Sequence, residues 1–320
     1  MPASEKQQVA PSPSLCTPAE LHAYLRNYER PYRAAYYGDA AHQIMRYGAI
    51  VGSRISHYRS LPRAMDYARQ LIDTWEKGKI SPISGTIITA DQLTGARGRF
   101  TRSWHAPPGG LWGVLVLVNT LLPASRRLLP IAMGITGWET VQLYGVQRAT
   151  IRWVNDVMIG ARKLAGFLAY SFVGANGSGE EYDLLGFGVN VNNREFPHHL
   201  QDHATSLGEE VGDAIELSEF ACRFFAKLSF NIGLLYSHEH DVQHERADAD
   251  TSHPLISRLR EASGFIGRRV RYGHDVEKAP RYEAVAAGID HDGGLRLRLD
   301  EGIELVEQSG EIRYLDENGG

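Results

Sequence analysis

The sequence predicts two structural units, a central domain of strands and helices followed by a small all-β domain. Two observations carry this prediction. Residues 55–192 alternate β-prone apolar runs with segments whose apolar residues recur at helical spacing. Beyond Gly264, short β-prone runs are separated by turns such as HDGG, a pattern typical of a small barrel or sandwich. A chain of 320 residues is long enough for two or more domains.

The individual elements follow from apolar spacing and from start and stop residues. Thr17 and Pro18 form a helix start, as N-cap and first helical residue, ahead of a short helix. Residues 27–54 show no clean period and receive no assignment. The expected helices are 18–25, 64–78, 128–145 and 220–236. The expected strands are 55–59, 86–90, 111–118, 149–154, 163–172 and 182–192, then 268–273, 282–289, 295–299 and 303–307.

Three segments are expected to lie outside helices and strands. Residues 1–15 are rich in Pro, Ser and Gln and predict a disordered lead-in. Residues 173–181, VGANGSGEE, have the composition of a hairpin turn. Residues 237–250 are strongly charged and predict a solvated loop or linker.

Composition excludes several classes of protein. Apolar content of 43%, charged content of 22% and a net charge of −4 are ordinary for a globular domain and offer no basic excess for nucleic acid. Cys16 and Cys222 lie far apart and form neither a disulfide framework nor a metal-ligand spacing, which favours a reducing compartment. No run of apolar residues is long enough to span a bilayer, and no secretory signal is evident. We therefore expect a cytoplasmic protein that binds neither membrane nor nucleic acid.

Polar residues gather at the ends of apolar strands in the central domain. Residues 95–110 read GARGRFTRSWHAPPGG, with Arg97, Arg99 and Arg102 within six residues and flanked by glycines. Arginine forks suit carboxylate and phosphate, and glycines let a backbone approach a ligand closely. The stretch therefore predicts a mobile loop that closes over an anionic ligand. Two further segments, RWVND (152–156) and RKLAG (162–166), lie at strand ends where sheet proteins tend to build sites.

These segments, taken in order, closely resemble the biotin protein ligases. The glycine–arginine loop with its Trp and Pro-Gly turn, RWVND, RKLAG, GFGVN (186–190) and ATSL (204–207) all match that family's pattern. The tail, with GIDHDGGLRL (288–297) and SGEI (309–312), is similar to the family's C-terminal domain. The resemblance covers roughly residues 55–315. It implies an α+β fold, with a central mixed β-sheet and flanking helices as in class II synthetases, and a small SH3-like C-terminal β-barrel.

The resemblance also implies an activity and its partners. Biotin would attack ATP, assisted by Mg²⁺ bound mainly through the nucleotide, to give biotinyl-5′-AMP. The biotinyl group would then pass to a lysine of a biotin carboxyl carrier protein domain. The chain is expected to have an N-terminal extension (1–54) that is partly disordered and lacks a helix-turn-helix. A catalytic domain (55–262) and a C-terminal domain (263–316) would follow, and a homodimer is one assembly that the family allows.

Residue roles are carried over by matched position. Lys163, Arg99 and Asp156 are the expected catalytic residues. Lys163 would hold carboxylate and phosphate oxygens, and Asn155 and Asp156 would serve metal or phosphate positioning and the acceptor lysine. Cationic groups offset the repulsion between a carboxylate and a triphosphate, and a closed loop protects a mixed anhydride from water. The expected substrate- and adenylate-binding residues are Gln92, Arg97, Gly98, Arg99, Trp104, Asn155, Lys163, Gly166, Gly186 and Gly188, and no protein metal ligand is assigned.

The chain departs from the family pattern at the biotin-binding Ser-Thr-Asn motif. Arg63, Ala64 and Met65 stand at those positions, and Phe100 and Thr101 replace a charged residue and a glycine of the loop. The lost hydrogen-bonding groups keep two alternatives open. One is a ligase for lipoate or another acyl acid, and the other is a non-catalytic protein that binds biotin or an adenylate.

Overall fold

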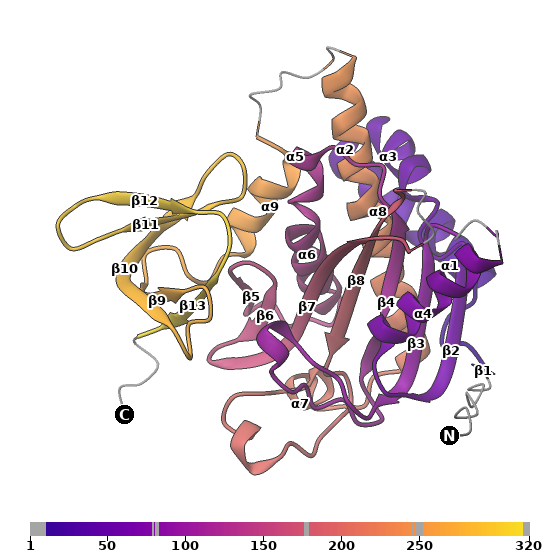
Figure 1. Ribbon diagram of the computed structural model, residues 1–320, viewed down its shortest axis with the longest axis horizontal. Coiled ribbons are helices and arrows are strands. Elements are labelled where there is room, and N and C mark those ends of the chain that lie inside the picture. Colours follow the sequence, from indigo (N-terminus) through magenta and orange to yellow (C-terminus); the bar gives the residue numbers. More distant parts are fainter. Residues whose placement is uncertain are drawn as a thin grey trace.

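The structure is a computed structural model that describes residues 11–78, 80, 83–175, 179–244, 246 and 252–315. Its centre is an eight-stranded sheet in the order β1-β2-β3-β4-β8-β7-β6-β5, in which β2 and β3 run parallel and the other neighbours antiparallel (Figure 1). The strands are β1 (Pro11–Ser12), β2 (Arg54–Leu61), β3 (Thr86–Leu93), β4 (Leu111–Val118), β5 (Ala149–Arg152), β6 (Asp156–Ile159), β7 (Arg162–Val173) and β8 (Glu181–Val189).

Helices cover both faces of this sheet. Helix α4 (Ala64–Lys77) packs on one face, and α6 (Leu129–Gln142) and α8 (Leu217–Gln243) pack on the other. Side chains alternate along β4 accordingly, because successive residues of a strand point to opposite faces. Val114 and Val116 join the cluster under α4, whereas Leu115 and Leu117 join the large core under α6 and α8.

The remaining helical segments are short. They are α1 (Pro18–Tyr24), η1 (Leu25–Glu29), α2 (Arg30–Tyr37), α3 (Ala40–Gly48), η2 (Arg99–Thr101), α5 (Pro123–Arg126), η3 (His198–Leu200), α7 (Leu207–Val211) and α9 (Pro254–Ala262).

The C-terminal strands form a second, separate sheet beside β5 and β6 (Figure 1). It is five-stranded and antiparallel, in the order β12-β11-β10-β9-β13. Its strands are β9 (Arg269–Gly273), β10 (Pro280–Ile289), β11 (Leu295–Arg298), β12 (Glu304–Glu307) and β13 (Glu311–Tyr314). The predicted fold class, a mixed sheet with flanking helices followed by a small β domain, is confirmed, and the SH3-like topology stays a prediction.

The segment 27–54, which showed no period, forms helices η1, α2 and α3 and the start of β2. Helix α3 approaches α8 closely, because a Cβ on Gly48 would lie 1.9 Å from the Ser229 carbonyl oxygen and one on Gly233 would lie 2.2 Å from that of Ile44. The predicted loop at 237–250 is wrong in its first half, since α8 continues to Gln243. The rest of that predicted loop lies mostly outside the described residues, at positions 245 and 247–250. Residues 1–10 of the predicted lead-in and 176–178 of the predicted hairpin turn also lie outside them.

A cluster of buried charges joins the N-terminal helices to the core. Arg33 donates to Glu29 at 2.7 Å and to Glu139 of α6 at 2.9 and 2.5 Å. Lys227 of α8 contacts Glu29 at 2.9 Å, and Arg258 of α9 donates to Glu139 at 2.9 Å. We call the buried residues Glu29, Arg33, Glu139 and Lys227, together with the partly exposed Arg258, the buried charge cluster. Ion pairs removed from water need such complete pairing, because an unpaired buried charge is strongly destabilising.

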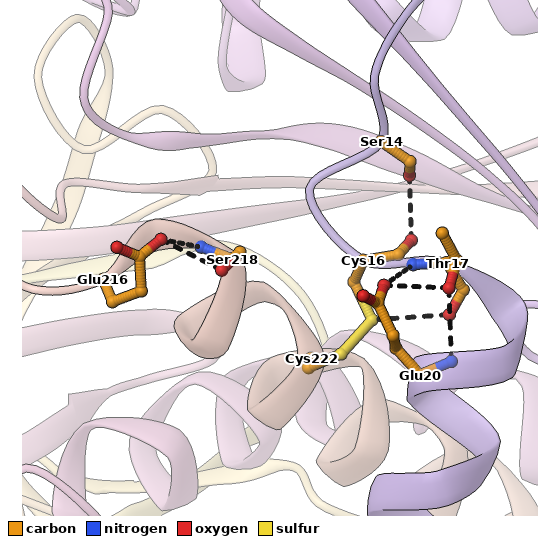
Figure 2. Close-up of a disulfide and its surroundings, with 7 residues drawn as sticks. All are labelled: Ser14, Cys16, Thr17, Glu20, Glu216, Ser218 and Cys222. Carbon is orange, nitrogen blue, oxygen red and sulfur yellow. Dashed lines mark hydrogen bonds between the residues drawn. A yellow bond between two sulfur atoms is a disulfide. The ribbon is translucent and has the colours of Figure 1, made fainter.

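The expectation that the two cysteines form no disulfide is wrong. Cys16 and Cys222 are bonded, with their Cα atoms 5.5 Å apart, because the segment before α1 folds back onto the first turns of α8 (Figure 2). Thr17 and Glu20 form a capping box directly after Cys16, so the start of α1 is held by both the cap and the bond. Sequence spacing could not reveal this pair, since 206 positions separate its members.

Reduction of this bond is expected to lower the free energy of unfolding by about 2–4 kcal/mol, because a cross-link between distant residues restricts the unfolded chain. Urea unfolding with and without dithiothreitol measures the difference. The Cys222→Ser variant serves as the control, since its unfolding should match that of the reduced protein and should not respond to the reductant. Equal midpoints for the wild type under both conditions would contradict the expectation.

Among the described helices, none is both long enough and apolar enough to cross a lipid bilayer.

Candidate active site

A cavity of about 970 Å³ lies between the central sheet and the C-terminal sheet. The arginine loop, the β5–β6 turn, the start of β7, strand β8 and strands β9 and β13 all contribute to its lining. The structure thus brings together ten of the predicted site residues: Arg97, Gly98, Arg99, Trp104, Asn155, Asp156, Lys163, Gly166, Gly186 and Gly188. Gln92 is not among the lining residues, whereas its neighbour Leu93 is.

Lys163 lies at the centre of a short chain of charges. Its ammonium is 2.6 Å from Asp156 Oδ1, and Arg152 donates to the other oxygen of that carboxylate at 2.8 Å. The register of β6 against β7 brings the three together, since Asp156 pairs with Gly166 and Met158 with Lys163 across a bulge. Lys163 keeps 28% of its side chain exposed, so its ammonium is held by Asp156 and still borders the cavity.

Burial and charge act in opposite directions on this pair. Burial tends to raise the pKa of the Asp156 carboxyl, but Lys163 and Arg152 outweigh it and hold that pKa well below its usual range. Burial also lowers the pKa of the Lys163 ammonium, and the Asp156 carboxylate opposes this change. The carboxylate therefore remains ionised and provides the negative charge that a cationic lysine needs inside a cavity.

The arginine loop is anchored to the C-terminal sheet. Arg102 donates to Asp275 at 2.5 Å and to the two oxygens of Glu311 at 3.2 and 2.7 Å. Arg99 donates to the backbone carbonyl of Gly310 at 2.7 Å. Phe100 adopts a left-handed backbone conformation, with φ of 53°, and its ring meets His274 edge-on at 5.0 Å. The loop that the sequence predicted to be mobile is here closed against the second domain.

Trp104 forms one wall of the cavity beside Lys163. The ammonium lies 5.1 Å from the centroid of its ring, a cation–π distance. A Cβ on Gly188 would lie 2.9 Å from Trp104 Nε1, and one on Gly166 would lie 2.9 Å from Lys163 Nζ. Glycine is therefore required at both positions for the indole and the lysine to pack where they do. The indole N–H is buried and has no hydrogen-bond partner among the described residues.

The segment at the Ser-Thr-Asn positions also borders the cavity. Arg63 precedes α4 without capping it and instead donates to Asp66 at 3.0 Å. Met65 lies against β8, with its sulfur 2.8 Å from where a Cβ on Gly186 would stand. This part of the cavity therefore presents a thioether and an ion-paired guanidinium in place of the motif's hydroxyl and amide groups.

Sequence reasoning missed four of the arginines that line the cavity. Arg102 and Arg152 lie inside the quoted motifs but received no role. Their position beside the predicted site residues was the signal that could have identified them as cavity residues. Arg271 and Arg313 lie on the C-terminal strands, where no local pattern marks them. In all, eight Arg or Lys and four Asp or Glu side chains line this cavity of a chain with net charge −4. Its chemistry therefore favours an anionic ligand.

Comparisons with known proteins agree with this fold. Residues 71–180 match the model of the biotin/lipoate A/B protein ligase family. The bifunctional ligase/repressor BirA of Bacillus spizizenii is 30% identical over 135 residues, which are 41% of each chain, so this chain spans about two fifths of that relative's length. The biotin–[acetyl-CoA-carboxylase] ligase of Mycobacterium tuberculosis is 28% identical over 239 residues, covering 73% of this chain and 80% of the relative.

Solved structures extend the likeness to most of the molecule. The biotin protein ligase from Aquifex aeolicus, in complex with biotin and ATP, superposes with a TM-score of 0.63 at 21% identity, covering 82% of this chain and 98% of that one. Residues 71–180 are thus similar to the biotin/lipoate A/B protein ligase family. The fold around them is that of a biotin protein ligase.

Proposed function

We propose that the chain is an ATP-dependent biotin–protein ligase, which forms biotinyl-5′-AMP and transfers the biotinyl group to a carrier-domain lysine. One observation carries the proposal. Lys163 from the central sheet and Arg97 and Arg99 from the loop line a single cavity, although they come from separate segments. The names of the relatives favour biotin as the acid over lipoate.

The first step joins two anions. A carboxylate oxygen of biotin attacks the α-phosphorus of ATP, the bond from that phosphorus to the bridging oxygen breaks, and pyrophosphate leaves. Lys163 and Arg99 would offset the charge that gathers on the α-phosphate oxygens. To do so, Arg99 exchanges its present acceptor, the Gly310 carbonyl, for the ligand. Asp156 keeps Lys163 cationic and in place.

The second step transfers the acyl group. The neutral amine of the acceptor lysine attacks the acyl carbon, AMP leaves, and the amine proton passes to solvent. Until then the mixed anhydride must be kept from water, and a closed loop serves this purpose. Arg97, Gly98 and Trp104 would enclose the adenylate, and Gly166, Gly186 and Gly188 would allow it to lie close to the strands. Gln92 and Asn155 complete the proposed set, although Asn155 already donates to the Phe167 carbonyl.

Mg²⁺ belongs to this proposal as part of the nucleotide substrate. The described residues hold no group of three or more His, Cys, Asp or Glu side chains placed to bind a metal ion. Asp156, the carboxylate beside Lys163, is already paired with two cations. The donor set therefore does not fit a resident metal ion, and Mg²⁺ would enter as the Mg–ATP complex.

The assembly and location are proposed on the same basis. We propose a catalytic domain at 55–262 and a C-terminal domain at 263–316, of which residue 316 lies outside the described part. The N-terminal helices, for which we propose no DNA-binding role, pack on α6 and α8 through the buried charge cluster. A cytoplasmic location is proposed from the composition, without the argument from unpaired cysteines that the Cys16–Cys222 bond removes, and a homodimer stays a proposal.

Pyrophosphate release from ATP tests the proposal, with biotin, lipoate or octanoate supplied in turn. We expect that, of the three acids, only biotin causes pyrophosphate release from ATP. When a biotin carboxyl carrier domain is added, its mass should increase. Release with lipoate or octanoate but not with biotin would show that the substrate is a lipoyl-type acid and not biotin. Binding of biotin without release of pyrophosphate would make the chain a binding protein.

A further inference from the structure

Two arginines of the C-terminal sheet face the cavity side by side. Arg271 lies on β9 and Arg313 on β13, and the two are direct partners in the antiparallel register. Direct partners project from the same face of a sheet, and both side chains line the cavity. Neither arginine belongs to the catalytic or substrate-binding residues proposed for the ligase reaction.

Like charges placed directly opposite on neighbouring strands repel one another, and here glutamates offset part of that repulsion. Among the described residues, each arginine has one glutamate partner. Arg271 contacts Glu283 at 3.0 Å, and Arg313 contacts Glu277. The two guanidinium side chains stay 45% and 38% exposed, so they retain donors that face the cavity.

The pair also lies close to the proposed site of reaction. The positive charge of Arg313 acts on Lys163, where it adds to the effect of burial in lowering the pKa of the ammonium. Glu277 links Arg313 to the arginine loop, since its other oxygen is 3.3 Å from Arg102 Nε. The C-terminal wall of the cavity thus carries Arg271 and Arg313 together with two carboxylates, Glu277 and Glu311.

We propose that Arg271 and Arg313 form a phosphate-binding pad, which holds the β- and γ-phosphates of the nucleotide and then the pyrophosphate that leaves. This inference rests on the proposed function, because that function places a triphosphate in the cavity. The central sheet and loop would bind the α-phosphate and the acid, and the pad would bind the far end of the triphosphate. Two guanidinium forks on adjacent strands suit an anion with several phosphoryl oxygens.

Calorimetric titration of inorganic pyrophosphate, ATP and AMP tests the pad. Arg313→Gln and Arg271→Gln are each expected to weaken pyrophosphate and ATP binding by about tenfold, the effect of losing one charge-assisted contact. AMP affinity should stay within about twofold of the wild type, because AMP carries no phosphate at the far end. Arg296→Gln is the matched control, since Arg296 lies on the same sheet, is similarly exposed and pairs with Glu304 at 2.6 Å, but does not line the cavity.

A second variant changes binding in the opposite direction. Glu283→Gln removes the carboxylate that competes for Arg271, so pyrophosphate affinity should rise severalfold. The pad would be overturned if Arg271→Gln and Arg313→Gln bound pyrophosphate as tightly as the Arg296→Gln control and Glu283→Gln bound it no more tightly than the wild type. Wild-type adenylate formation from biotin is measured separately, so a failure of the ligase function is distinguished from a failure of the pad.

Discussion

Lys163→Met is expected to slow adenylate formation by about a hundred- to a thousandfold, the effect of removing one group that stabilises transition-state charge. The ammonium lies in the cavity 2.6 Å from Asp156 and over the Trp104 ring. Methionine keeps an unbranched apolar stem against Trp104 and removes only the charge and its donors. Asp156 retains Arg152 as a partner, so no bare carboxylate is left behind.

Isotope exchange between pyrophosphate and ATP, with biotin present, measures this effect without a carrier protein. Lys77→Met is the matched control, because Lys77 is exposed at the end of α4 and lies outside the cavity. Biotin binding by Lys163→Met should weaken far less than exchange is slowed, since the lysine acts mainly on charge that develops during reaction. An exchange rate equal to that of Lys77→Met would remove Lys163 from the mechanism.

Glu139→Ala is expected to lower the free energy of unfolding by about 3–5 kcal/mol at neutral pH, because it leaves two buried cations, Arg33 and Lys227, to share the carboxylate of Glu29. Glu139 accepts hydrogen bonds from Arg33, Asn231 and Arg258 and is 5% exposed. Glu261→Ala is the control, since Glu261 also pairs with Arg258, at 2.7 Å, but is 57% exposed. Urea unfolding should separate the two variants clearly, because exposed ion pairs contribute little.

The same residue predicts a loss of stability in acid. Burial tends to raise the pKa of the Glu139 carboxyl, but Arg33, Lys227 and Arg258 outweigh it and lower the pKa to about 2. A lowered pKa in the folded state stabilises the protein above the unfolded value near 4.5, and this stabilisation is lost as the pH falls towards 2. The difference in unfolding free energy between wild type and Glu139→Ala should therefore shrink between pH 4.5 and 2. A constant difference over that range would show that Glu139 is not ionised in the folded protein.

The strands and long helices of the centre could be predicted because their apolar pattern is strong. The run at 111–118 coincides with β4, and the periods at 64–78 and 128–145 coincide closely with α4 and α6. Residues 27–54 could not be assigned, because Glu29 and Arg33 are buried there and interrupt the apolar period that a packed helix usually shows. Their burial depends on partners more than a hundred residues away in sequence, which no local pattern reveals.

One wall of the candidate site could be predicted from the sequence, and the other wall could not. The motifs identified the side chains of the loop and of β5 to β8, because glycine, arginine and lysine stand there in a recognisable order. The other wall of the cavity depends on how two domains meet. Arg271 and Arg313 lie on short alternating strands whose sequence resembles any exposed β surface. Only the register of β9 with β13 brings them together.

The buried charge cluster gives the N-terminal helices an unusual response to temperature. Water holds ions less strongly as it warms, so the penalty for burying Glu29, Arg33 and Glu139 falls on heating. The apolar contacts beneath the sheet weaken on cooling. The contacts of η1 and α2 with α6 and α8 should therefore weaken in a chilled solution, whereas the Cys16–Cys222 bond keeps the start of α1 on α8.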